Sequence, residues 1–200
     1  AAGSNIIGAD SSDSAEFNEG IVMSGGSAQL IADSNNLIRA KKNGIHIQGG
    51  DDNTIDLQGA FNEVSVDEGN AIATDENTNS KITITSTAEN SIISYGEDGK
   101  GIYTEKGSSG EIYIQGNGEK SGVLNQIYAG GSAIDHNGSQ FIEIKDDLGT
   151  NVIVGGYDFE ENKLKDSSAS ASGIVLKGNG QIHVSGSKNQ VFGANNGIEL

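Results

Sequence analysis

Residues 20–23, 44–47 and 101–104 read GIVM, GIHI and GIYT, and this short pattern decides the fold that the sequence predicts. Gly or Ala followed by Ile opens a segment seven times along the chain. The remaining four openings begin at Ala71, Ala133, Gly173 and Gly197. Recurrence at intervals of roughly 20–50 residues is typical of repeat proteins. The chain therefore consists of similar units.

Two further elements follow the openings in a constant order. The first is an alternating apolar segment, seen at Ile55 with Leu57, Ile82 with Ile84, Ile112 with Ile114, Ile142 with Ile144, and Ile182 with Val184. The second is Asn, any residue, then Ile or Val, beginning at Asn36, Asn62, Asn90, Asn125, Asn151 and Asn189. The shortest units, residues 20–43 and 173–196, place this Asn at the same offset. The other units are longer only in the stretches between these three elements, which indicates that loops are inserted into a fixed frame.

The composition excludes several classes of protein. Among 200 residues there are 24 Ile against 8 Leu, and no Pro or Cys, which favours strands over helices and excludes disulfides and thiolate metal sites. The formal charge of −16, with Arg39 as the single arginine, opposes binding to nucleic acid or anionic lipid. No apolar run is long enough to span a membrane, so we expect no membrane insertion by this chain.

Each unit offers three short strands that cannot bury their apolar sides alone, so stacking on the neighbouring units is required. We predict an all-β, single-stranded, right-handed parallel β-helix (solenoid) of about seven turns, formed by residues 1–200. Ile45 and Ile47 would point inward and His46 outward. The repeated Asn and Gly would occupy corners in the left-handed backbone region, and the Asn amides could bond one another between turns.

The Gly-Ile and Asn-x-Ile units, the absence of Cys and Pro, and the acidic background rich in Gly, Asn and Ser resemble the passenger region of Gram-negative autotransporter adhesins. The resemblance extends over essentially the whole chain. It implies a non-catalytic, surface-displayed adhesin or stalk that mediates adhesion, aggregation or biofilm formation, without a cofactor. It also implies an extracellular location at the bacterial cell surface, anchored to the outer membrane through other regions, with a host or bacterial surface glycan or protein as partner.

The chain starts within one unit and stops on GIEL, the opening of another. An uncapped solenoid end exposes backbone and apolar core. We therefore expect a segment excised from a longer rod, with end-to-end self-association of isolated copies. A purely structural filament subunit is the corresponding alternative function.

Loop insertions near residues 8–20 and 155–172 are the best candidates for recognition, because loops on a rigid frame commonly carry binding residues. The second insertion brings two aromatic residues next to three acids, and we predict a ligand-binding site formed by Tyr157, Asp158, Phe159, Glu160 and Glu161. A sugar ring or a basic protein patch would suit such a group. Equally, Phe159 and Leu164 could fold the loop back onto the wall.

A polysaccharide-active enzyme is the alternative from another class, with Asp51 and Asp52, Asp146 and Asp147, or the acids at 158, 160 and 161 as paired carboxylates. Each pair lies in an expected loop, so we favour solvent-exposed acidity and assign no catalytic residue. No metal site is assigned either, although weak calcium binding at Asp51 and Asp52 is conceivable.

Two side-chain columns follow from the alignment of the units. Asp56, Thr83, Tyr113, Glu143 and His183 should align on the outer face of the middle strands. Thr74, Thr104 and His136 take a position that is apolar in most other units. Buried, they would need hydrogen-bond partners, so we favour a wall that opens locally at this point.

Overall fold

The computed structural model describes residues 3–8, 17–76, 78–116, 123–166 and 169–200. Within these ranges the chain is all-β and contains no helix. Every pair of neighbouring strands runs in parallel except one small hairpin. The expectation of an all-β chain built from parallel strands is therefore confirmed.

One sheet, called sheet B here, takes a single strand from each of the seven Gly/Ala-Ile openings. Its strands pair in the order in which they occur in the chain, so each inner strand lies between the strands of the preceding and following units. They are β2 (Glu19–Met23), β5 (Asn43–Ile47), β7 (Asn70–Thr74), β9 (Ile102–Thr104), β12 (Ile134–His136), β16 (Ile174–Leu176) and β18 (Ile198–Glu199).

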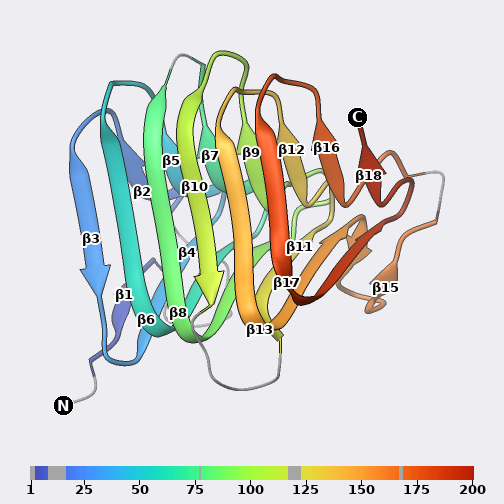
Figure 1. Ribbon diagram of the computed structural model, residues 1–200, viewed down its shortest axis with the longest axis horizontal. Coiled ribbons are helices and arrows are strands. Elements are labelled where there is room, and N and C mark those ends of the chain that lie inside the picture. Colours follow the sequence, from blue (N-terminus) through green and yellow to red (C-terminus); the bar gives the residue numbers. More distant parts are fainter. Residues whose placement is uncertain (1–2, 9–16, 77, 117–122, 167–168) are drawn as a thin grey trace.

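The other large sheet, sheet A, contains the alternating segments and the Asn-x-Ile segments. Figure 1 shows its long strands side by side in front of sheet B, with the two termini at opposite ends of the stack. Its strands are β1 (Asn5–Ile7), β3 (Ser27–Ile31), β4 (Asn35–Ala40), β6 (Asn53–Val66), β8 (Asn79–Ser94), β10 (Ser109–Gly116), β11 (Val123–Ala129), β13 (Phe141–Gly155) and β17 (Gln181–Gly193).

The prediction of three separate short strands in each unit is wrong for four units. In β6, β8, β13 and β17 the second and third elements form one continuous strand. The ladder accommodates the bend through register shifts, between Gly59 and Phe61 in β6 and between Asp146 and Thr150 in β13. An irregular residue bends a strand without ending its pairing, so alternation of apolar residues alone did not reveal the continuity.

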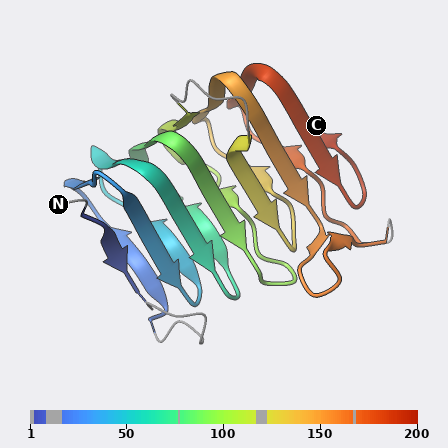
Figure 2. The same ribbon diagram turned by 90° about the horizontal axis from the view of Figure 1, so that it is seen from below.

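The apolar side chains stack between the two sheets with one residue contributed by each unit. Ile82 pairs with both Ile55 and Ile112, and Ile142 pairs with both Ile112 and Ile182. The first four of these side chains are fully buried, and Ile182 at the end of the stack is partly buried. Figure 2 shows the units as successive loops in a row. The predicted column of isoleucines is confirmed.

An uninterrupted ladder of asparagine amides runs beside this core. The Nδ2 group of each Asn donates to the Oδ1 atom of the Asn in the next unit, at distances of 2.7–2.9 Å. The same Nδ2 group donates to a backbone carbonyl, such as Gln115 O for Asn90 at 2.9 Å. The ladder connects Asn5, Asn36, Asn62, Asn90, Asn125, Asn151 and Asn189. The predicted bonding between amides is thus confirmed.

The prediction that the repeated Asn and Gly residues adopt the left-handed backbone conformation is wrong. Among the described residues other than Gly, only Asp52 and Asn162 have positive φ, so the ladder asparagines are not in the left-handed region. The glycines that open the units do not have positive φ either. At Gly101 an added Cβ would lie 2.5 Å from Ile127 Cγ2 and 2.7 Å from Ala133 O. Close packing, rather than backbone conformation, favours the small residue there.

The expectation of an open wall at His136 is also wrong. Thr74, Thr104 and His136 pair in register and are fully buried. The Nε2–H group of His136 donates to Gln140 O at 2.9 Å, which leaves Nδ1 to accept from the Thr104 hydroxyl at 2.5 Å. The buried Gln140 side chain donates to Thr74 Oγ1 and Ser80 Oγ. The polar column is enclosed because these partners satisfy it.

Because each amide in the ladder bonds the next, we expect a substitution of equal size at the centre of the ladder to reduce the stability of the fold. Asn90→Asp replaces the donor that faces Asn125 Oδ1 and Gln115 O with an acceptor. We expect it to lower the free energy of unfolding by about 2–4 kcal/mol, measured by urea denaturation at pH 7. Asn189→Asp, at the exposed last position, should cost less than about 1 kcal/mol. Equal losses at the two positions would contradict the ladder's role.

The buried imidazole predicts a pH dependence of stability. Burial lowers the pKa of His136 below its ordinary value of 6.5, so the unfolded chain binds a proton at a higher pH than the folded chain does. Stability should therefore decline as the pH falls below about 6.5. His136→Leu, which matches Leu176 in the next unit, should flatten this decline although its stability at pH 7.5 is lower. Denaturant titrations between pH 7.5 and 5 test this, and parallel profiles would contradict it.

Candidate functional site

The second predicted insertion forms a small antiparallel hairpin. Its strands β14 (Tyr157–Asp158) and β15 (Lys163–Leu164) pair Tyr157 with Leu164. Oδ1 of Asp158 accepts hydrogen bonds from the backbone N–H groups of Glu160 and Glu161 at 3.0 and 2.9 Å. Asn162, with φ of 54°, completes the turn. Residues 167–168 of this insertion and residues 9–16 of the insertion near 8–20 lie outside the described residues.

Four aromatic side chains from three units meet beside the hairpin, and we call Tyr95, Tyr128, Tyr157 and Phe159 the aromatic strip. Phe159 lies edge-to-face against Tyr95, with ring centroids 4.7 Å apart, and against Tyr157 at 5.0 Å. Tyr157 makes a similar contact with Tyr128 at 5.0 Å. Such pairs add stability beyond the area they bury. Phe159 thus packs back onto the earlier unit that carries Tyr95, whereas Leu164 remains exposed.

The aromatic strip stays accessible along one side. Tyr95 is 49% exposed, and the other three members are half-buried. Burial raises the pKa of Tyr95 and of Tyr128, so both hydroxyls remain protonated at neutral pH. The strip is therefore an uncharged surface with rings for stacking and hydroxyls for hydrogen bonding.

Of the five predicted ligand-binding residues, the structure brings only two rings together. Tyr157 and Phe159 belong to the aromatic strip, whereas Glu160 and Glu161 are exposed and Asp158 forms the turn. Sequence reasoning missed Tyr95 and Tyr128. The Asn alignment contained the necessary signal for Tyr128, because it places this residue in register with Val154, three residues before β14 begins at Tyr157.

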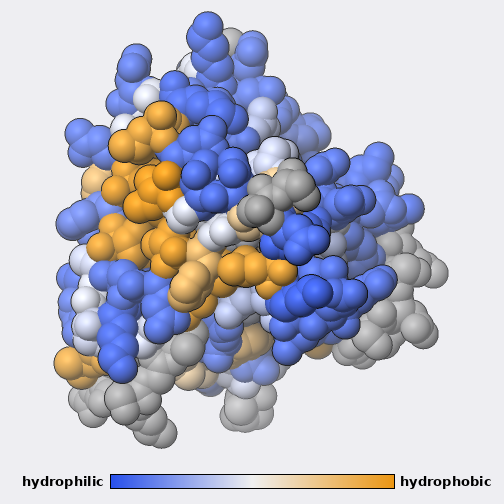
Figure 3. Space-filling view, turned by 90° about the vertical axis from the view of Figure 1, so that its right-hand side faces the viewer, coloured by the Kyte–Doolittle hydropathy of each residue, from blue (hydrophilic) through white to orange (hydrophobic). Residues whose placement is uncertain are grey.

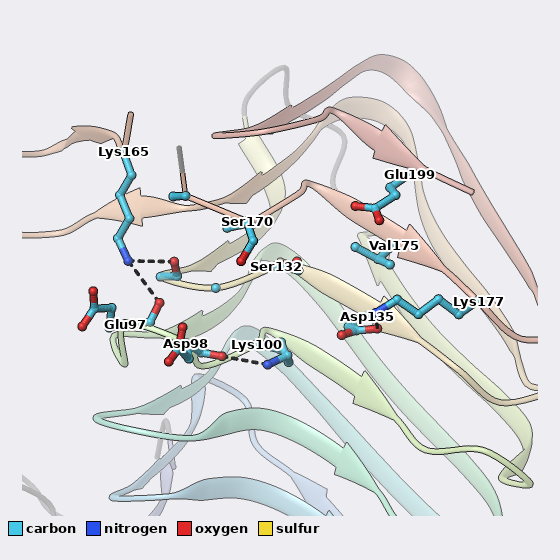
Figure 4. A pocket seen from close by; sticks show the side chains of 14 residues that line it. Glu97, Asp98, Lys100, Ser132, Asp135, Lys165, Ser170, Val175, Lys177 and Glu199 are labelled. Atoms are coloured by element: carbon cyan, nitrogen blue, oxygen red, sulfur yellow. Dashed lines mark hydrogen bonds and ion pairs between the residues drawn. The ribbon is translucent and has the colours of Figure 1, made fainter. Parts of the chain in front are cut away.

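Lys165 fastens the hairpin to the wall. Its Nζ group donates to two backbone carbonyls from earlier units, Glu97 O and Gly130 O, both at 3.0 Å. Its backbone N–H group donates to Gly156 O at 2.8 Å. Figure 4 shows the Lys165 side chain reaching from the hairpin strand to these two carbonyls. The position of the hairpin is thus set by backbone carbonyls of two earlier units.

Beside Lys165 lies a polar pocket of about 580 Å³. Its floor is the outer face of sheet B, where Asp135, Val175 and Glu199 lie in register on adjacent strands. Ala169, Ser170 and Ala171, which follow the hairpin, form part of its rim. Lys177 Nζ bonds Asp135 Oδ1 at 3.4 Å across two units. Figure 4 shows both lysine and carboxylate side chains around the pocket.

The other carboxylate pairs do not form an acid and base held at a fixed separation. Asp146 is buried, and its Oδ1 atom accepts from the N–H groups of Leu148 and Gly149, which makes it a turn residue. Asp147 is exposed beside Lys145. Asp51 and Asp52 are exposed in a turn where Asp52 has φ of 59°. Among the residues that the structure describes, no cluster of three or more His, Cys, Asp or Glu could hold a metal ion.

The outward column on sheet A is confirmed. Asp56, Thr83, Tyr113, Glu143 and His183 are register partners in successive strands. On sheet B, His46 also points outward, as expected, but it lies between Glu19 and Asp75 with nitrogen–oxygen distances of 3.1 and 2.9 Å. These contacts connect three units, so His46 acts as a bridge between the units on the outer face of sheet B.

Comparison with known proteins gives no relative for this chain. No protein-family model, no curated protein and no solved structure matches it. In the described ranges the chain has no helix long and apolar enough to cross a membrane. Interpretation of the site therefore depends on its geometry.

The contacts of Lys165 predict a local effect on the hairpin. Lys165→Met removes two charge-assisted hydrogen bonds, and we expect cleavage after Glu160 or Glu161 by a glutamate-specific protease to become about tenfold faster. Lys163→Met is the matched control, because Lys163 is exposed and pairs with Glu161 of the hairpin itself. Fragment mass spectrometry gives the rates. Unchanged cleavage in Lys165→Met would contradict the anchoring role.

Proposed function

We propose that the chain winds as a single-stranded, right-handed parallel β-helix. The support comes from strand order: both large sheets follow the order of the units, and each of the six units between residues 20 and 196 contributes to both. A chain that alternates between two such sheets passes round a common core once per unit. Right-handedness follows the preference of parallel crossover connections for that hand.

We further propose that this β-helix is part of a bacterial surface adhesin of the autotransporter type, located outside the cell and non-catalytic. The acidic repeats without Cys, together with the long stacked frame, support a displayed rod. Its partner would be a glycan or protein on a host or bacterial surface. End-to-end association of isolated copies belongs to the same proposal, because the apolar side chains Val191, Phe192, Ile198 and Leu200 are partly or largely exposed at one end (Figure 3).

The observation that carries the binding role is the aromatic strip. It combines rings from three units with an insertion that is fixed by Lys165 rather than left as a free loop. Aromatic residues on a rigid support contribute contact area at low entropic cost. A strip of this kind suits a surface that binds another molecule.

A cell-adhesion assay tests this role. Beads coated with the chain should adhere to epithelial cells or aggregate bacteria. Tyr157→Ala/Phe159→Ala should reduce adhesion about tenfold, because both rings leave the strip. The matched control is Tyr113→Ala/Phe141→Ala, which removes another pair of neighbouring rings, 6.1 Å apart on sheet A. Equal adhesion by the two double variants would refute the binding role of the strip.

A further inference from the structure

The pocket beside Lys165 continues across the outer face of sheet B. A second hollow shares Lys100, Asp135 and Lys177 with it. A third shares Asn137 and Lys177, together with Lys106, with the second. The first hollow is lined by residues just before β12, the first and second by Asp135 within β12, and the third by residues just after β12. We call these three connected hollows the groove.

The groove follows the strand direction of β12. Ser132 lies in the first hollow and Gly138 in the third. Between them the chain passes through β12, so the first and third hollows lie at opposite ends of this strand. Each hollow alone has a volume within the usual range for ligand sites, between about 480 and about 590 Å³. An elongated molecule could therefore lie along β12 and contact all three hollows.

Lysines gather in this groove although the whole chain has only 12 basic residues and a charge of −16. Lys100, Lys106, Lys165 and Lys177 line it. Lys100 and Lys165 donate to backbone carbonyls, and Lys100 also lies 6.0 Å from the centre of the Tyr103 ring. Lys177 contacts the carboxylate of Asp135. Four of the 12 basic residues of the chain therefore line the groove.

Carboxylate acceptors alternate with these donors. Glu97, Asp98, Asp135 and Glu199 line the first hollow, and Glu76 and Glu105 line the second. A polyanion would meet these six acids, and a polycation would meet the four lysines. Sugar hydroxyls donate and accept equally, so they match a surface where both kinds of group lie side by side. Apolar side chains that could anchor a peptide are few, with Val175 the largest aliphatic one in the first hollow.

We propose that the groove binds a linear, uncharged oligosaccharide that lies parallel to β12, with Lys177 at the centre of the site because it lines all three hollows. The proposal deepens the adhesin function proposed above, since it names the class of surface ligand. It also uses residues outside the aromatic strip. The Tyr103 ring in the second hollow supplies an apolar face against which a sugar ring can pack.

Calorimetric titration with neutral linear hexasaccharides tests the proposal. Cellohexaose, maltohexaose, laminarihexaose and mannohexaose are titrated into the whole chain, with hexagalacturonate as the acidic comparison. At least one neutral hexasaccharide should bind, and its monosaccharide should bind at least about tenfold more weakly because it fills only one hollow. Affinity for the neutral ligand should change less than about twofold between 50 and 300 mM NaCl.

Lys177→Gln should weaken binding about tenfold, and Lys100→Gln serves as a second variant in case the first perturbs Asp135. Lys81→Gln makes the same charge change on sheet A and should bind as the unaltered chain does. The proposal is overturned if no neutral hexasaccharide binds, if hexagalacturonate binds more tightly, or if both groove variants retain full affinity. A different result would reject the adhesin function alone. In that case the unaltered chain shows no cell adhesion, but oligosaccharide binding in the groove is still measured, including in Tyr157→Ala/Phe159→Ala.

Discussion

The amide ladder is the constraint on which the other features depend. Each ladder asparagine up to Asn151 uses its side-chain amide for two bonds, one to the next Asn and one to a backbone carbonyl. Aspartate lacks the donor and serine is shorter with a single donor, so neither can make both bonds. Because the buried amides are satisfied only when adjacent units are in register, a slip of one residue would leave polar groups unpaired as well as turn isoleucines outward.

Fixed register is also what assembles a surface from distant parts of the sequence. Tyr95, Tyr128 and Tyr157 belong to different units, yet the ladder brings Tyr128 into direct ring contact with Tyr157 and Tyr95 into contact with it through Phe159. On the opposite wall the same constraint aligns Tyr103, Asp135, Val175 and Glu199. Insertions can vary without disturbing this alignment because the frame does not depend on them.

Residue periodicity predicted the stacked isoleucines, the amide ladder and the outward column, since each depends only on equal positions in successive units. It did not predict features that depend on irregular positions. The bend within β6 arises at a register shift, and the burial of His136 depends on Gln140, which follows the strand and turns inward. At the site, Tyr157 and Phe159 were found from composition, whereas Tyr95 required knowledge of which units neighbour the hairpin.

The distribution of charge distinguishes Lys100 and Lys165 from Lys177 and the other basic residues that form cross-unit ion pairs. In a stack of acidic units, like charges repeat at the spacing of neighbouring strands, about 4.8 Å. Cross-unit pairs reduce that repulsion, as between Arg39 and Glu63 or Lys81 and Glu111. Such pairs are individually weak at the surface, but they occupy the basic groups that form them. Lys100 and Lys165 instead direct their ammonium groups to carbonyl oxygens at the groove. Lys100 donates to one backbone carbonyl and Lys165 to two, and an –NH₃⁺ group carries three donors, so each can also donate to a polar ligand.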